Sequence, residues 1–230
     1  MDQNYYNEGT SLTLNQYMAR TFRWMFLGLL TTFALAIAVA ATGLYVPIYN
    51  SGLIFALTIG ELILVMVLSA RVQNMSPGKA AAMFFLYAVL NGVVFSVYFI
   101  AYRLSTLVGA FLVAALYFGV LAAYGAFTQK DLSGWCTHIF AGLIALLIFS
   151  VISAIFHIGD TLLCFVGLAL FMCITAYDTQ KIKSYYYSFG HDGAMAEKAS
   201  IMAALSLYLD FINIFLYILR LFGRRSQNSN

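Results

Sequence analysis

Residues 199–219 read ASIMAALSLYLDFINIFLYIL, an apolar run that carries a single charged residue, Asp210. About twenty apolar residues are enough for a helix to cross a bilayer. A carboxylate near the bilayer centre costs on the order of 3 kcal/mol by insertion scales, so a retained one usually faces a protein interior or water. At helical spacing, Ser206, Asp210 and Asn213 share one stripe. We therefore expect this helix to turn a polar side toward other helices.

The rest of the chain is almost as apolar. Of its 230 residues, 63% are hydrophobic and 9% are charged, which is too apolar for a soluble domain. The pattern predicts an all-α membrane protein, with a polar N-terminal tail (1–19), one seven-helix transmembrane domain (20–223) and a polar C-terminal tail (224–230). The predicted spans fall at about 21–45, 53–70, 80–102, 106–127, 136–157, 161–182 and 199–222.

Basic residues in short loops predict the orientation of the chain. With the N-terminus inside, eight of the twelve basic residues lie on the cytoplasmic side. They are Arg20, Arg23, Arg71, Lys79, Lys130, Lys181, Lys183 and Lys198. The opposite loops hold only Arg103, so we expect a cytoplasmic N-terminus. Seven spans would place Arg224 and Arg225 outside, against the rule, which leaves a re-entrant last helix as an alternative.

Composition and motifs exclude several classes of function. A net charge of +3 without a basic cluster does not indicate a nucleic-acid partner. Glycines fall mostly inside spans and form no phosphate-binding motif, so no cofactor is expected. Cys136, Cys164 and Cys173 lie in or beside spans, and we expect no disulfide. Ala115, Gly119 and Ala123 recur every four residues, a spacing that predicts close helix packing in lipid.

Two more acids interrupt apolar runs: Asp178 in ITAYDTQKIK and Glu61 in TIGELILV. Counted from the predicted inner helix ends, Asp178 lies about 6 Å deep and Asp210 about 12 to 15 Å deep, so their meeting requires a tilted helix or a shifted helix start. Each acid could instead have a purely structural role. Asp178 could form a surface ion pair with Lys181, Asp210 could be a buried hydrogen-bonded acid, and Thr58 or backbone carbonyls could satisfy Glu61.

If Asp178 and Asp210 meet, they form a proton-sensitive pair. Two adjacent carboxylates shielded from water do not ionise together easily, so the pair would titrate in two steps. The deprotonated pair offers oxygen ligands to calcium, but calcium prefers six to eight ligands, so binding would be weak and suited to transit. Arg71 is the best-placed basic residue to close the site, although it could equally be a topology-setting arginine.

Two segments carry a resemblance to a known family: AYDTQKIK, residues 176–183, and ALSLYLDFINIFLYILRLFG, residues 204–223. Together with seven spans, they make the chain similar to the Bax inhibitor (transmembrane Bax-inhibitor-motif) family over essentially its whole length. The resemblance implies six helices around a central seventh and a pH-sensitive calcium leak.

The resemblance also implies roles for four residues. The family's paired aspartates map onto Asp178 and Asp210, its latching arginine onto Arg71, and an acidic residue of the cation pathway onto Glu61. The match favours a bacterial-type member in a plasma membrane, with an endomembrane protein as the alternative.

The sequence therefore leaves three classes of function open. The first is a calcium leak gated by the aspartate pair, in a protein whose partners are the bilayer, calcium and protons. The second is an interaction protein that regulates a membrane protease or cell-death factors, and the third is a proton-coupled cation antiporter. An enzyme is not expected: Tyr177-Asp178 matches half of an intramembrane aspartyl protease motif, but Leu207, Tyr208 and Leu209 replace the Gly-x-Gly pattern that would precede the second aspartate.

Overall fold

The computed structural model describes residues 12–156, 160–190 and 192–227, and every element in these ranges is a helix. Residues 1–11 of the predicted N-terminal tail and 228–230 of the C-terminal tail lie outside them. The long helices are α1 (Leu14–Thr42), α3 (Leu53–Arg71), α4 (Pro77–Ala101), α5 (Leu104–Phe127), α6 (Cys136–Phe156), α7 (Asp160–Phe189) and α8 (Gly193–Gln227). The short ones are α2 (Tyr45–Asn50), η1 (Val72–Asn74) and η2 (Ser133–Trp135). Seven helices in the described ranges are long and apolar enough to span a membrane, which confirms the predicted fold class.

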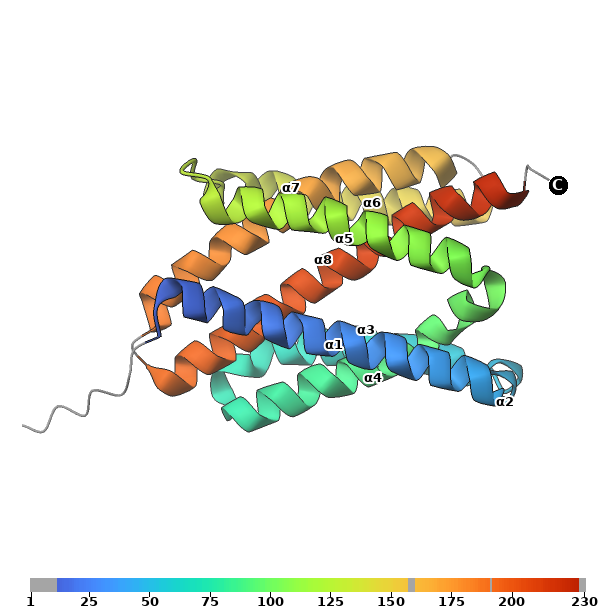
Figure 1. The fold of residues 1–230 in the computed structure, drawn as a ribbon, viewed down its shortest axis with the longest axis horizontal. Helices are drawn as coiled ribbons and strands as arrows, with labels where there is room; N and C mark the ends of the chain where they lie inside the picture. The colour runs from blue at the N-terminus through green and yellow to red at the C-terminus, as the bar shows by residue number, and fades with distance from the viewer. Residues whose placement is uncertain (1–11, 157–159, 191, 228–230) are drawn as a thin grey trace, which may run out of the picture.

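Helix α8 lies at the centre of the bundle. It runs diagonally between two groups of three helices, α1, α3 and α4 on one side and α5, α6 and α7 on the other (Figure 1). Within its apolar span, 67% of the residues are buried, against at most 39% in the other spans. Helix α3 packs mainly on α4, and α6 mainly on α7. The prediction of a central last helix surrounded by six others is confirmed.

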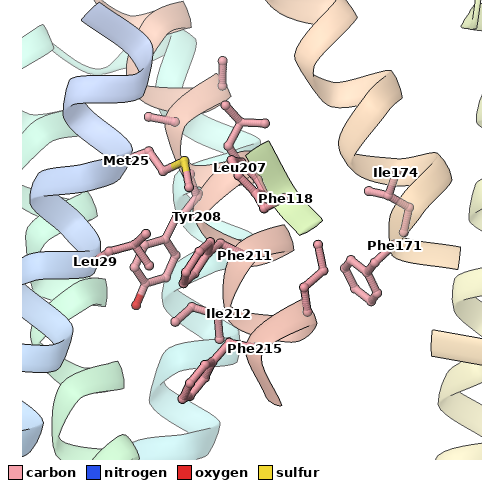
Figure 2. Close-up of a cluster of buried hydrophobic side chains, with 14 of the residues drawn as sticks. Met25, Leu29, Phe118, Phe171, Ile174, Leu207, Tyr208, Phe211, Ile212 and Phe215 are labelled. Carbon is pink, nitrogen blue, oxygen red and sulfur yellow. The ribbon is translucent and has the colours of Figure 1, made fainter. Parts of the chain in front are cut away.

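Aromatic and aliphatic side chains of α8 fill the space between the two groups. Figure 2 shows Tyr208 directed toward Leu29 of α1, with Phe171 of α7 on the opposite side of the central helix. Phe211 of α8 makes an edge contact with Phe118 of α5, with ring centroids 5.7 Å apart. In a bilayer, such interdigitation stabilises the bundle through dispersion rather than through exclusion of water.

Three helix boundaries lie well beyond the predicted positions. Helix α1 begins seven residues early because Thr13 and Gln16 form a capping box, in which each side chain accepts a hydrogen bond from the other residue's backbone N–H. Helix α7 continues to Phe189, and α8 begins at Gly193, where the Asp192 carboxylate accepts hydrogen bonds from two backbone N–H groups of the first turn. The prediction placed these ends where polar residues begin, but the helices continue through those polar residues.

The two ends of the described chain lie at opposite ends of the bundle. Helix α8 crosses its full length and finishes at the end opposite the start of α1 (Figure 1). The alternative of a re-entrant last helix is therefore wrong.

The predicted packing stripe on α5 is also wrong. Gly119 and Ala123 are exposed, and a Cβ added at Gly119 would meet no atom within 4 Å. The close contact lies on another face, where a Cβ added at Gly125 would overlap the carbonyl oxygen of Ala176 in α7. Small residues occur on both faces of α5, so their spacing alone does not identify the one that packs.

Candidate functional site

Asp210 is buried in the middle of the central helix. Its side chain is 3% exposed, and its Oδ2 atom has no hydrogen-bond partner among the described residues. Thr175 of α7 lies beside the carboxyl group. Thr175 Oγ1 likewise has no hydrogen-bond partner in the described part of the chain, so the two groups are neighbours without hydrogen-bond geometry. Two polar groups thus face each other in an apolar interior without satisfying each other.

Asp178 lies on α7, one helical turn from Thr175, and is partly exposed. Its carboxylate interacts electrostatically with that of Asp210, and Ser206 of α8 lies beside it. The polar stripe of α8 therefore faces α7, as its composition predicts. Asn213, the next residue of the stripe, donates from Nδ2 to the Leu209 carbonyl at 2.8 Å and so satisfies its amide within its own helix.

Lys181 does not neutralise Asp178 by a direct ion pair. Its ammonium group lies 5.8 Å from the ring centre of Tyr177 and 5.5 Å from that of Tyr185, which places it over two aromatic faces. It interacts with Asp178 electrostatically, but no ion pair at contact distance joins them in the described ranges. The surface ion pair between Asp178 and Lys181, which the sequence allowed as a purely structural role for Asp178, is not found in the described ranges.

Two close contacts hold α7 against its neighbours, one with α8 and one with α5. The Tyr217 ring of α8 lies over Gly167 of α7, where any larger residue would overlap it. Near Asp178, Gly125 of α5 rests on the Ala176 backbone of α7. Because both contacts depend on a missing Cβ, α7 is held closely between α5 and α8 along the length that carries the acids.

Arg71 is exposed at the C-terminal end of α3 and makes no ion pair with either aspartate among the described residues. A different basic residue links this region to the central helix. Lys198 of α8 is only 9% exposed and donates from Nζ to the Gln73 carbonyl of η1 at 2.7 Å. This conformation does not place Arg71 on the aspartate pair, and its predicted role as a latch stays a prediction.

Glu61 belongs to a separate polar cluster on the other side of α8. It is 8% exposed, its Oε1 atom has no hydrogen-bond partner in the described ranges, and it interacts electrostatically with Tyr87 and Tyr208. The Tyr208 hydroxyl lies 2.7 Å from Thr32 Oγ1, which donates to the Ala88 carbonyl at 2.9 Å. The central helix therefore presents one polar face to α7 and another to α1, α3 and α4.

The aspartate pair could hold a hard cation only with additional ligands. No group of three or more acidic, histidine or cysteine side chains in the described ranges is arranged to bind a metal. Calcium takes six to eight oxygen ligands, so two carboxylates would need water and backbone carbonyls to complete the shell. This arrangement is suited to brief occupancy rather than storage.

Sequence reasoning missed the contacts that fix the N-terminal end of α8. Arg20 of α1 pairs with Glu197 at 3.0 Å, and Thr21 Oγ1 lies 3.0 Å from Ser200 Oγ. The spacing of Arg20 and Thr21 matches no motif that would have revealed these partners, because each pair is separated by almost the whole chain.

These features define a multi-pass integral membrane protein organised around one central helix that carries a buried acid. The family model described as Inhibitor of apoptosis-promoting Bax1 matches residues 14–227, and the chain belongs to this family, the Bax inhibitor family. The predicted resemblance is confirmed.

Bacterial relatives match over nearly their full lengths. The chain is 37% identical to the inner membrane protein YbhL of Escherichia coli K12 over 92% of this chain and 93% of that protein. It is 37% identical to an uncharacterised protein of Deinococcus radiodurans, over 93% of this chain and 94% of the other. It is also 35% identical to the uncharacterised protein RP147 of Rickettsia prowazekii, over 92% and 91% of the two chains.

Proposed function

We propose that this protein is a pH-sensitive calcium leak channel in which protonation of the Asp178 and Asp210 pair controls passage between α7 and α8. The observation that carries the proposal is the placement of the pair. One carboxyl group is buried on the central helix with an unsatisfied oxygen, and the other is partly exposed on the adjoining helix within electrostatic range.

The pair is well placed to respond to protons. Two negative charges in a site of low dielectric repel each other strongly, whereas a proton on either carboxyl group removes that repulsion. Gaining or losing this proton therefore changes the force between α7 and α8. Because α8 lies between both groups of helices, a small displacement of it would alter the packing of the whole bundle.

The same pair could serve as a transient binding site for a cation on its way through the protein. Asp178 is partly exposed and Asp210 is buried deeper along α8, so a cation could exchange solvent ligands for carboxylate oxygens on entering. Weak binding by two carboxylates favours release as well as entry. We further propose a bacterial plasma membrane as the location, with the N-terminus in the cytoplasm, as the distribution of basic residues predicts.

Calcium entry into proteoliposomes tests this function. The full chain would be reconstituted in calcium-free vesicles that contain a fluorescent calcium indicator, and entry would be followed over a range of pH. We expect pH-dependent entry for the native chain, and several-fold slower, pH-insensitive entry for Asp178→Asn and for Asp210→Asn, because each change removes one anionic ligand and the shared proton.

Asp131→Asn provides the matched control, since Asp131 is exposed in the connection between α5 and α6. It should behave like the native chain. Unchanged, pH-dependent entry in both pair variants would contradict the proposal, and would favour a protein that acts through membrane partners. Calcium accumulation against its gradient, driven by an imposed proton gradient, would instead indicate a proton-coupled antiporter.

A further inference from the structure

An apolar groove of about 300 Å³ opens on the side of the bundle between α1 and α5. All its lining side chains are apolar, and it lies where the two groups of three helices meet. Its floor is formed by three phenylalanines from different helices. Phe33 of α1 makes edge contacts with Phe111 of α5 and Phe215 of α8, with ring centroids 5.2 Å and 5.5 Å apart. The groove therefore reaches the central helix.

The length of the groove corresponds to one leaflet of a bilayer. Its lining on α1 extends from Phe26 to Ile37, a rise of about 16 Å at 1.5 Å per residue. The hydrocarbon core of a bilayer is about 30 Å thick, so one leaflet contributes about 15 Å. On the opposite wall, the lining begins at Leu104, the first residue of α5, so the groove starts near the membrane surface.

Two arginines lie at the end of the bundle where the groove begins. Arg103 is exposed and directly precedes Leu104. Arg220 of α8 is exposed and lies beside Tyr98, the residue before Phe99 of the groove. A phosphate group near both guanidinium groups would be attracted to them, while an apolar chain extended below it.

We propose that this groove binds one phospholipid, with an acyl chain between α1 and α5 and its phosphate near Arg103 and Arg220. The acyl chain of the bound lipid would contact Phe215 and would fill the space between the two groups of helices. This proposal does not depend on the calcium pathway, because the groove lies on the α1 and α5 side of α8, whereas the aspartate pair faces α7.

Retention of lipid by the purified chain tests the site. The full chain would be purified with repeated detergent exchange, and its remaining phospholipid would be quantified by mass spectrometry. We expect about one phospholipid per native chain, and loss of most of it in Val108→Trp, whose indole would fill the groove. Val120→Trp is the matched control, since Val120 is a membrane-facing valine of the same helix outside the groove. It should retain the lipid, and Arg103→Gln should retain less than the native chain.

Photochemical labelling of the native chain gives a second measurement that does not depend on how the variants fold. A phospholipid with a diazirine in its acyl chain would be added to bilayers that contain the protein. We expect labels on Phe33 and Phe111, because the acyl chain of a phospholipid reaches these two residues only by entering the groove. Labels confined to outward-facing residues such as Val120 would overturn the proposal. So would equal retention of lipid by all variants, or a two-chain assembly that Val108→Trp dissociates, since a second copy would then cover the groove.

Discussion

Asp210 and Asp178 are unequal partners. Asp210 is buried with an unsatisfied oxygen, whereas Asp178 retains access to solvent and lies near the Lys181 ammonium group. Burial of a polar group without a hydrogen bond costs about 1 to 3 kcal/mol in proteins. An unsatisfied Asp210 oxygen therefore lowers the stability of the fold, and the proposed function would account for a residue with this cost.

Replacing this carboxyl group with an apolar side chain should stabilise the protein. We expect Asp210→Leu to raise the free energy of unfolding by about 1 kcal/mol, because the unsatisfied polar group is removed from an apolar site of similar size. Thermal unfolding in detergent micelles measures the effect. Asp178→Leu is the comparison and should change stability little, since Asp178 is partly exposed. A clear loss of stability in Asp210→Leu would indicate that Asp210 has a structural role.

Asp131, in the connection between α5 and α6, offers a test of pH dependence outside the membrane-spanning segments. The hydroxyl of Ser133 donates to Asp131 Oδ1 at 2.5 Å and its backbone N–H donates at 2.9 Å, and these bonds hold the pKa of Asp131 below its ordinary value. The turn is therefore stabilised above the ordinary pKa of aspartate, and this contribution is lost as the pH falls through the lowered pKa. We expect Ser133→Ala to raise the pKa toward its ordinary value, as measured by NMR titration of the carboxyl carbon. An identical titration in the variant would contradict this assignment.

At the scale of helices, the contact between α5 and α7 depends on Gly125. A side chain at this position would press on the Ala176 backbone, two residues from Asp178. Overpacking of this kind typically costs 1 to 3 kcal/mol, and a backbone carbonyl cannot rotate away as a side chain can. The close packing of α7, which carries Asp178, against α5 therefore depends on the missing Cβ of Gly125.

Gly125→Ala should lower the free energy of unfolding by about 1 to 3 kcal/mol and displace α7. Gly119→Ala, on the same helix, should be neutral or slightly stabilising, because nothing lies within 4 Å of the added Cβ and alanine favours helix. Thermal unfolding of both variants in the same detergent makes the comparison. Equal stability of the two would mean that α5 and α7 are not closely packed at Gly125.

The helices could be predicted from the sequence better than their contacts. A lone charge in an apolar run identified α8 as a helix that needs protein neighbours, and the stripe of Ser206 and Asn213 indicated which side was polar. The depth count required a tilted helix or a shifted helix start for the two aspartates to meet, and the structure has both features (Figure 1). Asp178 lies eleven residues before the end of α7 and Asp210 seventeen after the start of α8, and because α8 crosses the bundle diagonally, distance along the helix exceeds depth in the membrane.

Most contacts between distant residues could not be predicted. The proximity of Glu61 to Tyr87 and Tyr208, and the bond from Lys198 to the Gln73 carbonyl, join segments with no shared motif. The approach of the two aspartates was a hypothesis from their placement in two apolar runs, and the resemblance of two motifs to a known family added support to it. A single sequence contains the periodicity of each helix but not the angle at which two helices cross.

At the scale of the whole molecule, α8 joins two groups of three helices that contact each other little except through it. Each side of α8 carries its own polar residues, with Asp210 toward α7 and Tyr208 toward α1 and α4. A change of charge at the aspartate pair would therefore act on the one element that both groups share. Under the proposed function, this arrangement would let one proton at the pair alter the whole bundle.

A double-mutant cycle on the pH dependence of calcium entry tests the central claim most directly. If Asp178 and Asp210 share a proton and act as one unit, removing either should abolish the response, and Asp178→Asn combined with Asp210→Asn should be no more impaired than either single variant. Calcium entry into proteoliposomes would be measured for the native chain, both single variants and the double variant over the same pH series. Equal loss in all three variants is the predicted result, and independent, additive effects of the two substitutions would contradict it.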